Sequence, residues 1–340
     1  MKKTDDDSYL WDGSGEPDPE VARLETLLVQ LRQPGVLPVL PKRQRRGLHL
    51  TSWTIGALSA AATVLLVGAV AWFVFGRGRS EWLVQTIAGA PVVDGVQATR
   101  TADTVRLGIG EWLVTDTMSR ARISVAQIGR VDVEPNTRLQ LLARGREHRL
   151  ALARGTIHAR IWAPPRLFFV NTPSATAIDL GCEYTLQVDD GGAGLLHVTS
   201  GWVGLEGDGR EAFIPEGAVG ATRPGVGPGT PYYEDAPSGY GEALAILDFG
   251  PADQPQRAAA LDLILSTARR RDALTLWHLM QRGPAAERER VFDRLAALAP
   301  PPPAATRSAV LAGERRALDQ WWDTLGIDNT AWWKLWKKKL

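Results

Sequence analysis

The sequence is short of several residue types, and each shortage excludes a class of protein. One cysteine, Cys182, stands among 340 residues, which excludes an intramolecular disulfide framework and a multi-cysteine zinc site. The formal net charge is only +1, from 39 basic and 38 acidic residues, so the whole chain lacks the positive field typical of nucleic-acid-binding proteins. No lysine lies between Lys42 and Lys334, whereas tryptophan, at 13 residues, outnumbers both Phe and Tyr.

One stretch has no charged residue at all. Residues 51–75 read TSWTIGALSAAATVLLVGAVAWFVF, and a bilayer core of ~30 Å needs ~20 helical residues. Trp53 and Trp72 are separated by about 28 Å along a helix, a spacing that places one indole in each headgroup layer. We therefore predict a transmembrane helix over 51–76, in preference to a buried helix of a globular domain.

The flanks of this stretch predict its orientation. Four basic residues shortly precede it and two follow it, and this bias favours a cytoplasmic N-terminus. Arg45-Arg46 also fits a twin-arginine export signal, although we favour a basic stop at the membrane face. The residues expected at the membrane interface are Trp53, Trp72, Arg43, Arg45 and Arg46.

Residues 1–50 read as a cytoplasmic tail that contains one short amphipathic helix, at about 19–32. Asp18-Pro19-Glu20 supplies an N-cap residue, a proline at the first helical position and an acidic first turn. A helix of this length is marginal alone in water, so its apolar stripe needs either a protein partner, which we favour, or the inner membrane surface. The candidate partner-binding residues are Trp11, Val21, Leu24, Leu28 and Leu31.

Residues 81–222 have the pattern of an all-β domain. Glycines separate short segments in which apolar residues alternate with polar ones, as at Ile123 and Val125 and again at Val131 and Val133. Short alternating strands with frequent turn signals are typical of a sandwich or jelly-roll-like fold. The fold class is therefore a multi-domain membrane protein with one transmembrane helix, this β domain and a helical C-terminal region.

The β region contains no recognisable catalytic or metal-binding motif. His148, His158 and His197 lack metal-ligand spacing, and no GxSxG elbow frames a serine nucleophile. Cys182 is best interpreted as a small buried hydrophobe, and Asp189-Asp190-Gly191-Gly192 as a hairpin turn. We expect no enzyme activity, no cofactor and no metal.

Residues 105–206 contain blocks that resemble the FecR domain in order and spacing. The blocks are Val105-Arg106-Leu107-Gly108, Gly110-Glu111-Trp112-Leu113, Ser119-Arg120-Ala121-Arg122-Ile123, Gly129-Arg130-Val131, Pro135-Asn136-Thr137-Arg138-Leu139, Leu152-Ala153-Arg154-Gly155-Thr156-Ile157, Phe169-Val170-Asn171-Thr172-Pro173, Gly181-Cys182-Glu183-Tyr184 and Val198-Thr199-Ser200-Gly201-Trp202-Val203. Where this chain has Gly181-Cys182, the family commonly has Gly-Thr. The resemblance implies a periplasmic β domain on a single-pass inner-membrane protein whose cytoplasmic tail acts on an extracytoplasmic-function (ECF) sigma factor.

The remainder divides into a linker and a helical region. Residues 223–254 are expected to form a linker because Pro224–Pro237 is rich in proline and glycine. Residues 255–340 show helical spacing of apolar residues. The final segment, Trp332 to Lys339, suits either an anionic membrane interface or packing of its tryptophans on the helices, and we favour the packing.

Together these features favour an inner-membrane signal-transducing regulator, either an anti-sigma factor or another sigma regulator. It would sense an envelope signal through the FecR-like domain and act on a cytoplasmic ECF sigma factor. The alternative is a structural cell-envelope protein whose exported β and helical domains bind glycan or other envelope proteins. We expect a cytoplasmic N-terminus, periplasmic C-terminal domains, an unidentified envelope or outer-membrane partner, and no direct contact with nucleic acid.

Overall fold

The computed structural model describes residues 19–29, 82–97, 104–250 and 254–327. The chain divides into two units, residues 1–74 and 75–340. None of the helices in the described ranges is long and apolar enough to cross a membrane. The predicted span, 51–76, lies outside those ranges.

The described part of the first unit is one helix, α2 (Pro19–Leu28). It begins at Pro19, whose missing N–H costs nothing at a helix start, and Glu20 places negative charge in its first turn. None of its side chains is buried. Residues 30–32, the expected end of this helix, lie outside the described ranges.

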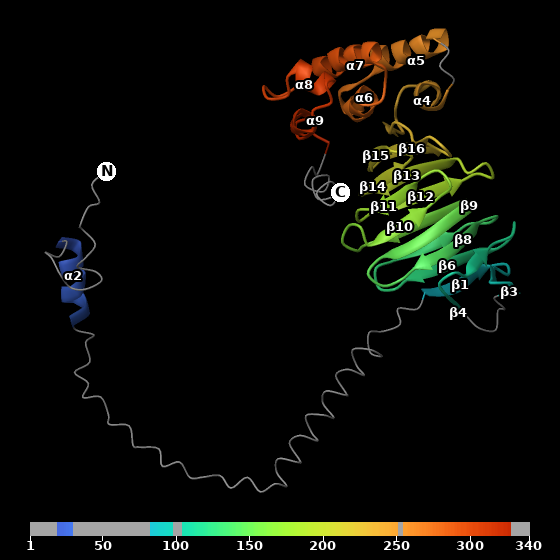
Figure 1. Cartoon of the computed structure of the whole chain (residues 1–340). Coiled ribbons are helices and arrows are strands. Elements are labelled where there is room, and N and C mark those ends of the chain that lie inside the picture. Colours follow the sequence, from blue (N-terminus) through green and yellow to red (C-terminus); the bar gives the residue numbers. More distant parts are fainter. Residues whose placement is uncertain (1–18, 30–81, 98–103, 251–253, 328–340) are drawn as a thin grey trace, which may run out of the picture. The chain divides into compact units, whose positions relative to one another are not determined.

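The second unit opens with the β domain that the alternating pattern predicts (Figure 1). Its strands are β1 (Trp82–Ala88), β2 (Val92–Val93), β3 (Val96–Gln97), β4 (Thr104–Leu107), β5 (Trp112–Val114), β6 (Arg120–Val125), β7 (Gly129–Val133), β8 (Arg138–Ala143), β9 (His148–Ile161), β10 (Phe168–Asn171), β11 (Thr176–Asp179), β12 (Glu183–Val188), β13 (Gly194–Ser200), β14 (Trp202–Gly207), β15 (Arg210–Pro215), β16 (Ala218–Arg223), β17 (Gly227–Pro228) and β18 (Tyr232–Tyr233).

The strands form two sheets that share β9. One sheet runs in the order β4-β1-β6-β7-β9-β12-β13-β16, with β17 and β18 both paired to β16. The other runs in the order β3-β2-β5-β8-β9-β10-β11-β14-β15. All pairs are antiparallel except β9 with β10. The apolar residues that alternate along these strands meet in one core, and Ile123, Val125, Val131 and Val133 are at most 1% exposed.

Gly155 allows β9 to pass from one sheet to the other. Residues up to Arg154 pair with β8, whereas Gly155 onward pairs with β12. Gly155 has φ +97°, and a Cβ at this position would lie 2.3 Å from the hydroxyl oxygen of Thr137. That hydroxyl bonds both the N–H and the carbonyl of Thr156, so only glycine fits this bend.

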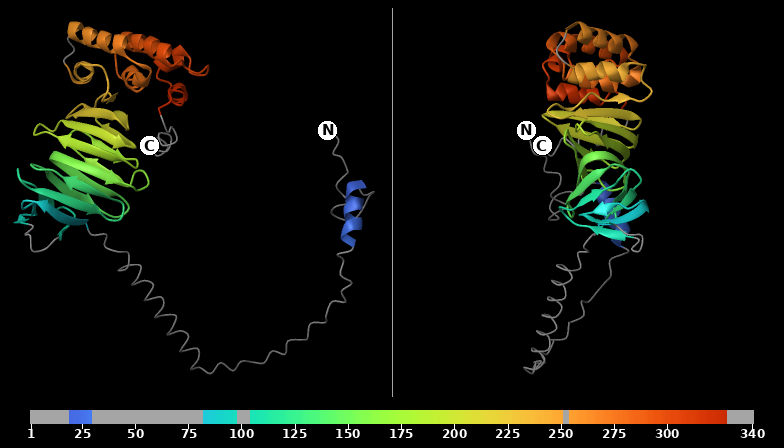
Figure 2. Two further views of the ribbon diagram at one scale, coloured as in Figure 1. Left: turned by 180° about the vertical axis from the view of Figure 1, so that it is seen from behind. Right: turned by 90° about the vertical axis from the view of Figure 1, so that its right-hand side faces the viewer.

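Helices follow the β domain and confirm the predicted helical C-terminal region. They are α4 (Tyr240–Phe249), α5 (Gln254–Thr267), the short 3₁₀ helix η2 (Arg270–Asp272), α6 (Ala273–Met280), α7 (Ala285–Leu298), α8 (Arg307–Leu311) and α9 (Arg315–Trp322). Figure 2 shows them at the β16 end of the sheets, with β1 and β4 at the opposite end.

The segment 223–254, expected to be a linker, is instead structured. It contains β17, β18 and α4. Helix α4 starts after Gly239, which has φ +82°, and it buries Tyr240, Ala243, Leu244 and Leu247. The proline and glycine content before Pro237 obscured this apolar face, which follows the last of those breakers by only a few residues.

Candidate functional site

The sequence-predicted partner-binding residues that the structure describes lie on one face of α2. At 100° per residue, Val21, Leu24 and Leu28 fall on a single stripe, and Leu27 extends it. Leu24, Leu27 and Leu28 are 57%, 65% and 56% exposed, and Val21 is half-buried. Thr26 lies on the opposite face, where its hydroxyl donates to the Ala22 carbonyl over 2.8 Å.

This leucine face, defined as Val21, Leu24, Leu27 and Leu28, has no apolar cover among the described residues of its unit. Three exposed leucines within two turns are unfavourable in water unless something covers them. A ten-residue helix is also marginal alone. The face is therefore suited to bind an apolar surface.

The other predicted site residues are not part of this geometry. Those of the tail and the expected membrane interface lie outside the described residues: Trp11, Leu31, Arg43, Arg45, Arg46, Trp53 and Trp72.

A buried carboxyl–thiol pair occupies the turn between β11 and β12. Cys182 is a buried free cysteine, and its Sγ–H donates to Asp179 Oδ2 over 2.6 Å. The N–H of Gly181 donates to Asp179 Oδ1 over 2.8 Å. Burial raises the pKa of Asp179 to about 7, and these two hydrogen bonds oppose that rise.

This pair is built for structure and not for nucleophilic chemistry. Burial raises the pKa of the Cys182 thiol, and the neighbouring Asp179 carboxylate raises it further. A reactive cysteine needs a lowered pKa and access to solvent. The expectation that Cys182 behaves as a small buried side chain is confirmed, and the structure adds its partner Asp179.

The three histidines of the β domain do not converge. His158 Nδ1 lies 2.8 Å from Thr185 Oγ1, and His197 Nδ1 lies 2.9 Å from Glu234 Oε1. His148 is buried against Trp82, with ring centroids 5.9 Å apart, and burial lowers its pKa. Within the described ranges no cluster of three or more His, Cys, Asp or Glu side chains could hold a metal ion.

The junction between the β domain and the helices was not apparent from the sequence. All eight residues of α6 are buried, and His278 within it accepts the backbone N–H of Phe213 at Nε2 over 3.2 Å. The Phe213 ring lies between Trp202, at 4.7 Å, and Trp322, at 5.8 Å between centroids. The sequence signal for this contact was a histidine in a helix whose other residues, apart from Thr275, are apolar.

Charged groups also stabilise the same junction. Asp248 of α4 is buried and accepts from the N–H of Thr230 over 2.6 Å and from its hydroxyl over 3.1 Å. Arg282 lies 3.7 Å from Asp248 and also donates to the Glu211 carbonyl of β15. Burial lowers the pKa of Arg282 to about 10, because desolvation disfavours its charged form. A cavity of about 440 Å³ lies beside this group, lined in part by Arg210 and Arg315.

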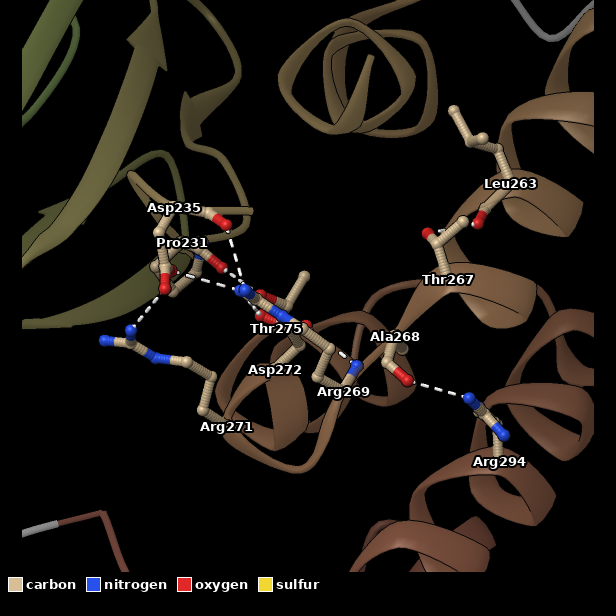
Figure 3. A network of polar contacts seen from close by, with 10 residues as sticks. All are labelled: Pro231, Asp235, Leu263, Thr267, Ala268, Arg269, Arg271, Asp272, Thr275 and Arg294. Atoms are coloured by element: carbon tan, nitrogen blue, oxygen red, sulfur yellow. Dashed lines mark hydrogen bonds and ion pairs between the residues drawn. The ribbon is translucent and has the colours of Figure 1, made fainter. Parts of the chain in front are cut away.

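A second polar network ties the helices to the segment after β18 (Figure 3). Asp235 accepts from Arg269 over 3.1 Å and from Arg271 over 2.6 Å. Arg269 Nε also donates to the fully buried Asp272 over 2.9 Å, and Thr275 donates to the Pro231 carbonyl over 2.8 Å. The Arg269–Asp272 bonds lie within the helical region. The buried Thr275–Pro231 hydrogen bond and the ion pairs of the exposed Asp235 join that region to the segment around β18.

Comparison with known proteins identifies the β domain. The model of the family described as FecR protein matches residues 111–204. No curated protein is similar enough to the sequence to count as a match.

Solved structures give a much weaker likeness. Two crystal structures of a proposed anti-sigma factor from Parabacteroides distasonis are similar to this chain, with 12% identity and a TM-score of 0.33. Each similarity covers 39% of the present chain. The chain covers 63% and 62% of those two chains. At that score the likeness supports no argument. The family match does, and residues 111–204, which run from β5 into β14, are therefore a FecR domain.

Proposed function

We propose that the chain is a single-pass inner-membrane regulator of an ECF sigma factor, and that it acts by binding and not by catalysis. The FecR domain at 111–204 is the observation that carries this proposal, since the family couples a periplasmic β domain to a cytoplasmic tail that acts on such a sigma factor. The uncharged stretch 51–75 supplies the membrane span between them.

In this proposal the leucine face of α2 is the contact with the sigma factor. Burying a fully exposed leucine stabilises a complex by about 1.5–3 kcal/mol. Leu24, Leu27 and Leu28 are each a little more than half exposed, so together they contribute about 3–5 kcal/mol. A micromolar complex needs about 8 kcal/mol, and the rest of the tail, including Trp11 and Leu31, would supply the difference.

The periplasmic half would receive an envelope signal as one connected body. Strand β15, which follows the FecR domain, is joined to the helical region by the Phe213–His278 hydrogen bond and by the bond that Arg282 donates to the Glu211 carbonyl. A partner that binds the helices therefore acts directly on β15 and its neighbours. Such a partner would control release or activation of the sigma factor. Whether the regulation is negative or positive would depend on which partner binds.

The full chain, purified from membranes in mild detergent, provides the test. Its topology is measured by protease accessibility on each side of the membrane, and its partner by co-purification with the ECF sigma factor encoded nearest to it. We expect a cytoplasmic tail, periplasmic β and helical domains, and recovery of the sigma factor. A correctly inserted chain that recovers no sigma factor would instead support a structural role in the cell envelope, with the exported domains binding glycan or envelope proteins.

A further inference from the structure

The strands of the β domain run between two sets of turns. We call the first set the entry turns, because they lie near β1 at the end where the chain enters that strand: residues 108–111, 126–128, 144–147 and 162–166. The second set, the distal turns, comprises residues 115–119, 134–137, 189–193 and 208–209. Both sets follow from the strand pairing. The pairing also puts turns 180–182, 201 and 216–217, the last with Glu216, at the entry end, but on strands farther from β1 in the sheets.

Contacts around Trp82, the first residue of β1, show that the entry turns lie together. Trp82 pairs with Leu107, which leads into turn 108–111. Its ring lies 5.9 Å from His148, at the end of turn 144–147, and 6.3 Å from Phe168, which follows 162–166. The N–H of Trp162 donates to the carbonyl of Ile128 over 2.9 Å, which joins turn 162–166 to turn 126–128.

The two sets of turns carry opposite charge. The entry turns contain three basic residues, Arg144, Arg146 and Arg166. They also contain two acids: Glu147, which pairs with Arg149 over 3.2 Å, and Glu111, which accepts the N–H of Gly108 over 2.7 Å. Within the described residues Arg144 and Arg146 form no ion pair. The distal turns contain no basic residue and five acidic ones: Asp116, Glu134, Asp189, Asp190 and Asp208.

The entry turns also expose large apolar side chains beside these arginines. Ile109 is 56% exposed, and Trp162 is 62% exposed although its indole N–H donates to the Gln127 carbonyl over 3.0 Å. An indole with nearby arginines is the composition that membrane–water interfaces favour.

Chain length places this end near the bilayer. The predicted span ends at residue 76, six residues before Trp82, and six residues reach at most about 20 Å. We propose that the entry turns rest on the anionic phospholipid headgroups of the membrane that anchors the chain, with Trp162 and Ile109 at the interface. This inference rests on the transmembrane anchoring in the proposed function. It fixes which end of the FecR domain faces the membrane.

The test uses the full chain in vesicles of phosphatidylcholine and phosphatidylglycerol that contain headgroup-quencher lipids. A fluorophore is attached in a Cys182→Thr background through Gln127→Cys on an entry turn, or through Met118→Cys on a distal turn. Met118 is a suitable control because it is 77% exposed and lies at the other end of β1, roughly 20 Å away. We expect strong quenching at 127 and little at 118.

Charge removal then tests the headgroup contact. Arginine near an anionic surface contributes about fivefold to binding, so Arg144→Gln with Arg146→Gln should lower the docked-to-undocked ratio about 30-fold and release the quenching at 127. Arg154→Gln removes a positive charge beside Asp190 on a distal turn and should leave the docked-to-undocked ratio unchanged. Equal quenching at 127 and 118 in a carbonate-resistant chain would overturn this proposal alone. A chain that carbonate extracts from the vesicles would overturn the anchoring as well.

Discussion

The buried Asp179 carboxyl should make the stability of the FecR domain depend on pH. Its pKa is about 7 in the folded chain against an ordinary value of 3.8, so folding favours the protonated form. The stabilisation is complete below pH 4, where both states bind the proton, and is lost as pH rises to about 7. At 1.36 kcal/mol per pKa unit, the loss amounts to about 4 kcal/mol.

Asp179→Asn isolates this effect. The amide keeps the shape of the protonated acid, and its oxygen can still accept the Gly181 N–H, but it cannot ionise. Between pH 5 and pH 7.5 the wild-type chain should therefore lose about 2–3 kcal/mol relative to the variant. His148, whose pKa burial lowers, titrates in the opposite sense but equally in both proteins, so the difference cancels it.

Thermal unfolding followed by near-ultraviolet circular dichroism measures the effect. For a domain of this size about 1 kcal/mol shifts Tm by roughly 2–4 °C. The gap in Tm between variant and wild type should thus widen by about 5–10 °C from pH 5 to pH 7.5. Parallel pH curves for the two proteins would show that Asp179 is ionised in the folded chain, and would refute the reasoning.

Three further substitutions test the packing. In denaturant titration, Gly155→Ala should lower the free energy of unfolding by about 3 kcal/mol or more. Gly209→Ala, at φ +73° with open space around it, should lower it by only about 1–2 kcal/mol. Similar losses for the two variants would contradict the crowding around Gly155 in β9. Trp322→Ala should remove about 3–5 kcal/mol and hasten proteolysis of the helical region, and an unchanged cleavage rate would contradict the junction. Cys182→Thr keeps a donor for Asp179 and should be tolerated within about 1 kcal/mol, while Cys182→Val should cost more; equal melting temperatures would show that the thiol makes no useful hydrogen bond.

The sequence predicted those parts of the fold that depend on local pattern. Alternation at Ile123, Val125, Val131 and Val133 was sufficient because one face of each strand is buried. The Asp189–Gly192 turn was confirmed, with the N–H of Gly192 donating to the carbonyl of Asp189.

Contacts between distant residues could not be predicted in this way. Phe213 and His278 are 65 positions apart, and their hydrogen bond exists only because α6 packs on β15. The edge-to-face contact between Trp322 and Phe213 is of the same kind. The Asp179–Cys182 pair is different, since its partners are three residues apart, and an acid before a Gly-Cys turn was a readable signal.

The candidate site was predictable where it is helical. The stripe at Val21, Leu24 and Leu28 follows from their spacing alone, and the structure adds that Leu24 and Leu28 are exposed. The membrane-facing residues Trp53 and Trp72 remain predictions.

The most direct measurement of the proposed function is the dissociation constant between the full chain in detergent and its ECF sigma factor, with one charge placed on either face of α2. Leu24→Asp buries an unpaired carboxylate in the contact, which costs at least about 2 kcal/mol and should weaken binding about 30-fold or more. Thr26→Asp adds the same charge on the opposite face and should change the constant by less than about threefold. Equal weakening by the two variants, or no weakening by Leu24→Asp, would contradict binding through the leucine face.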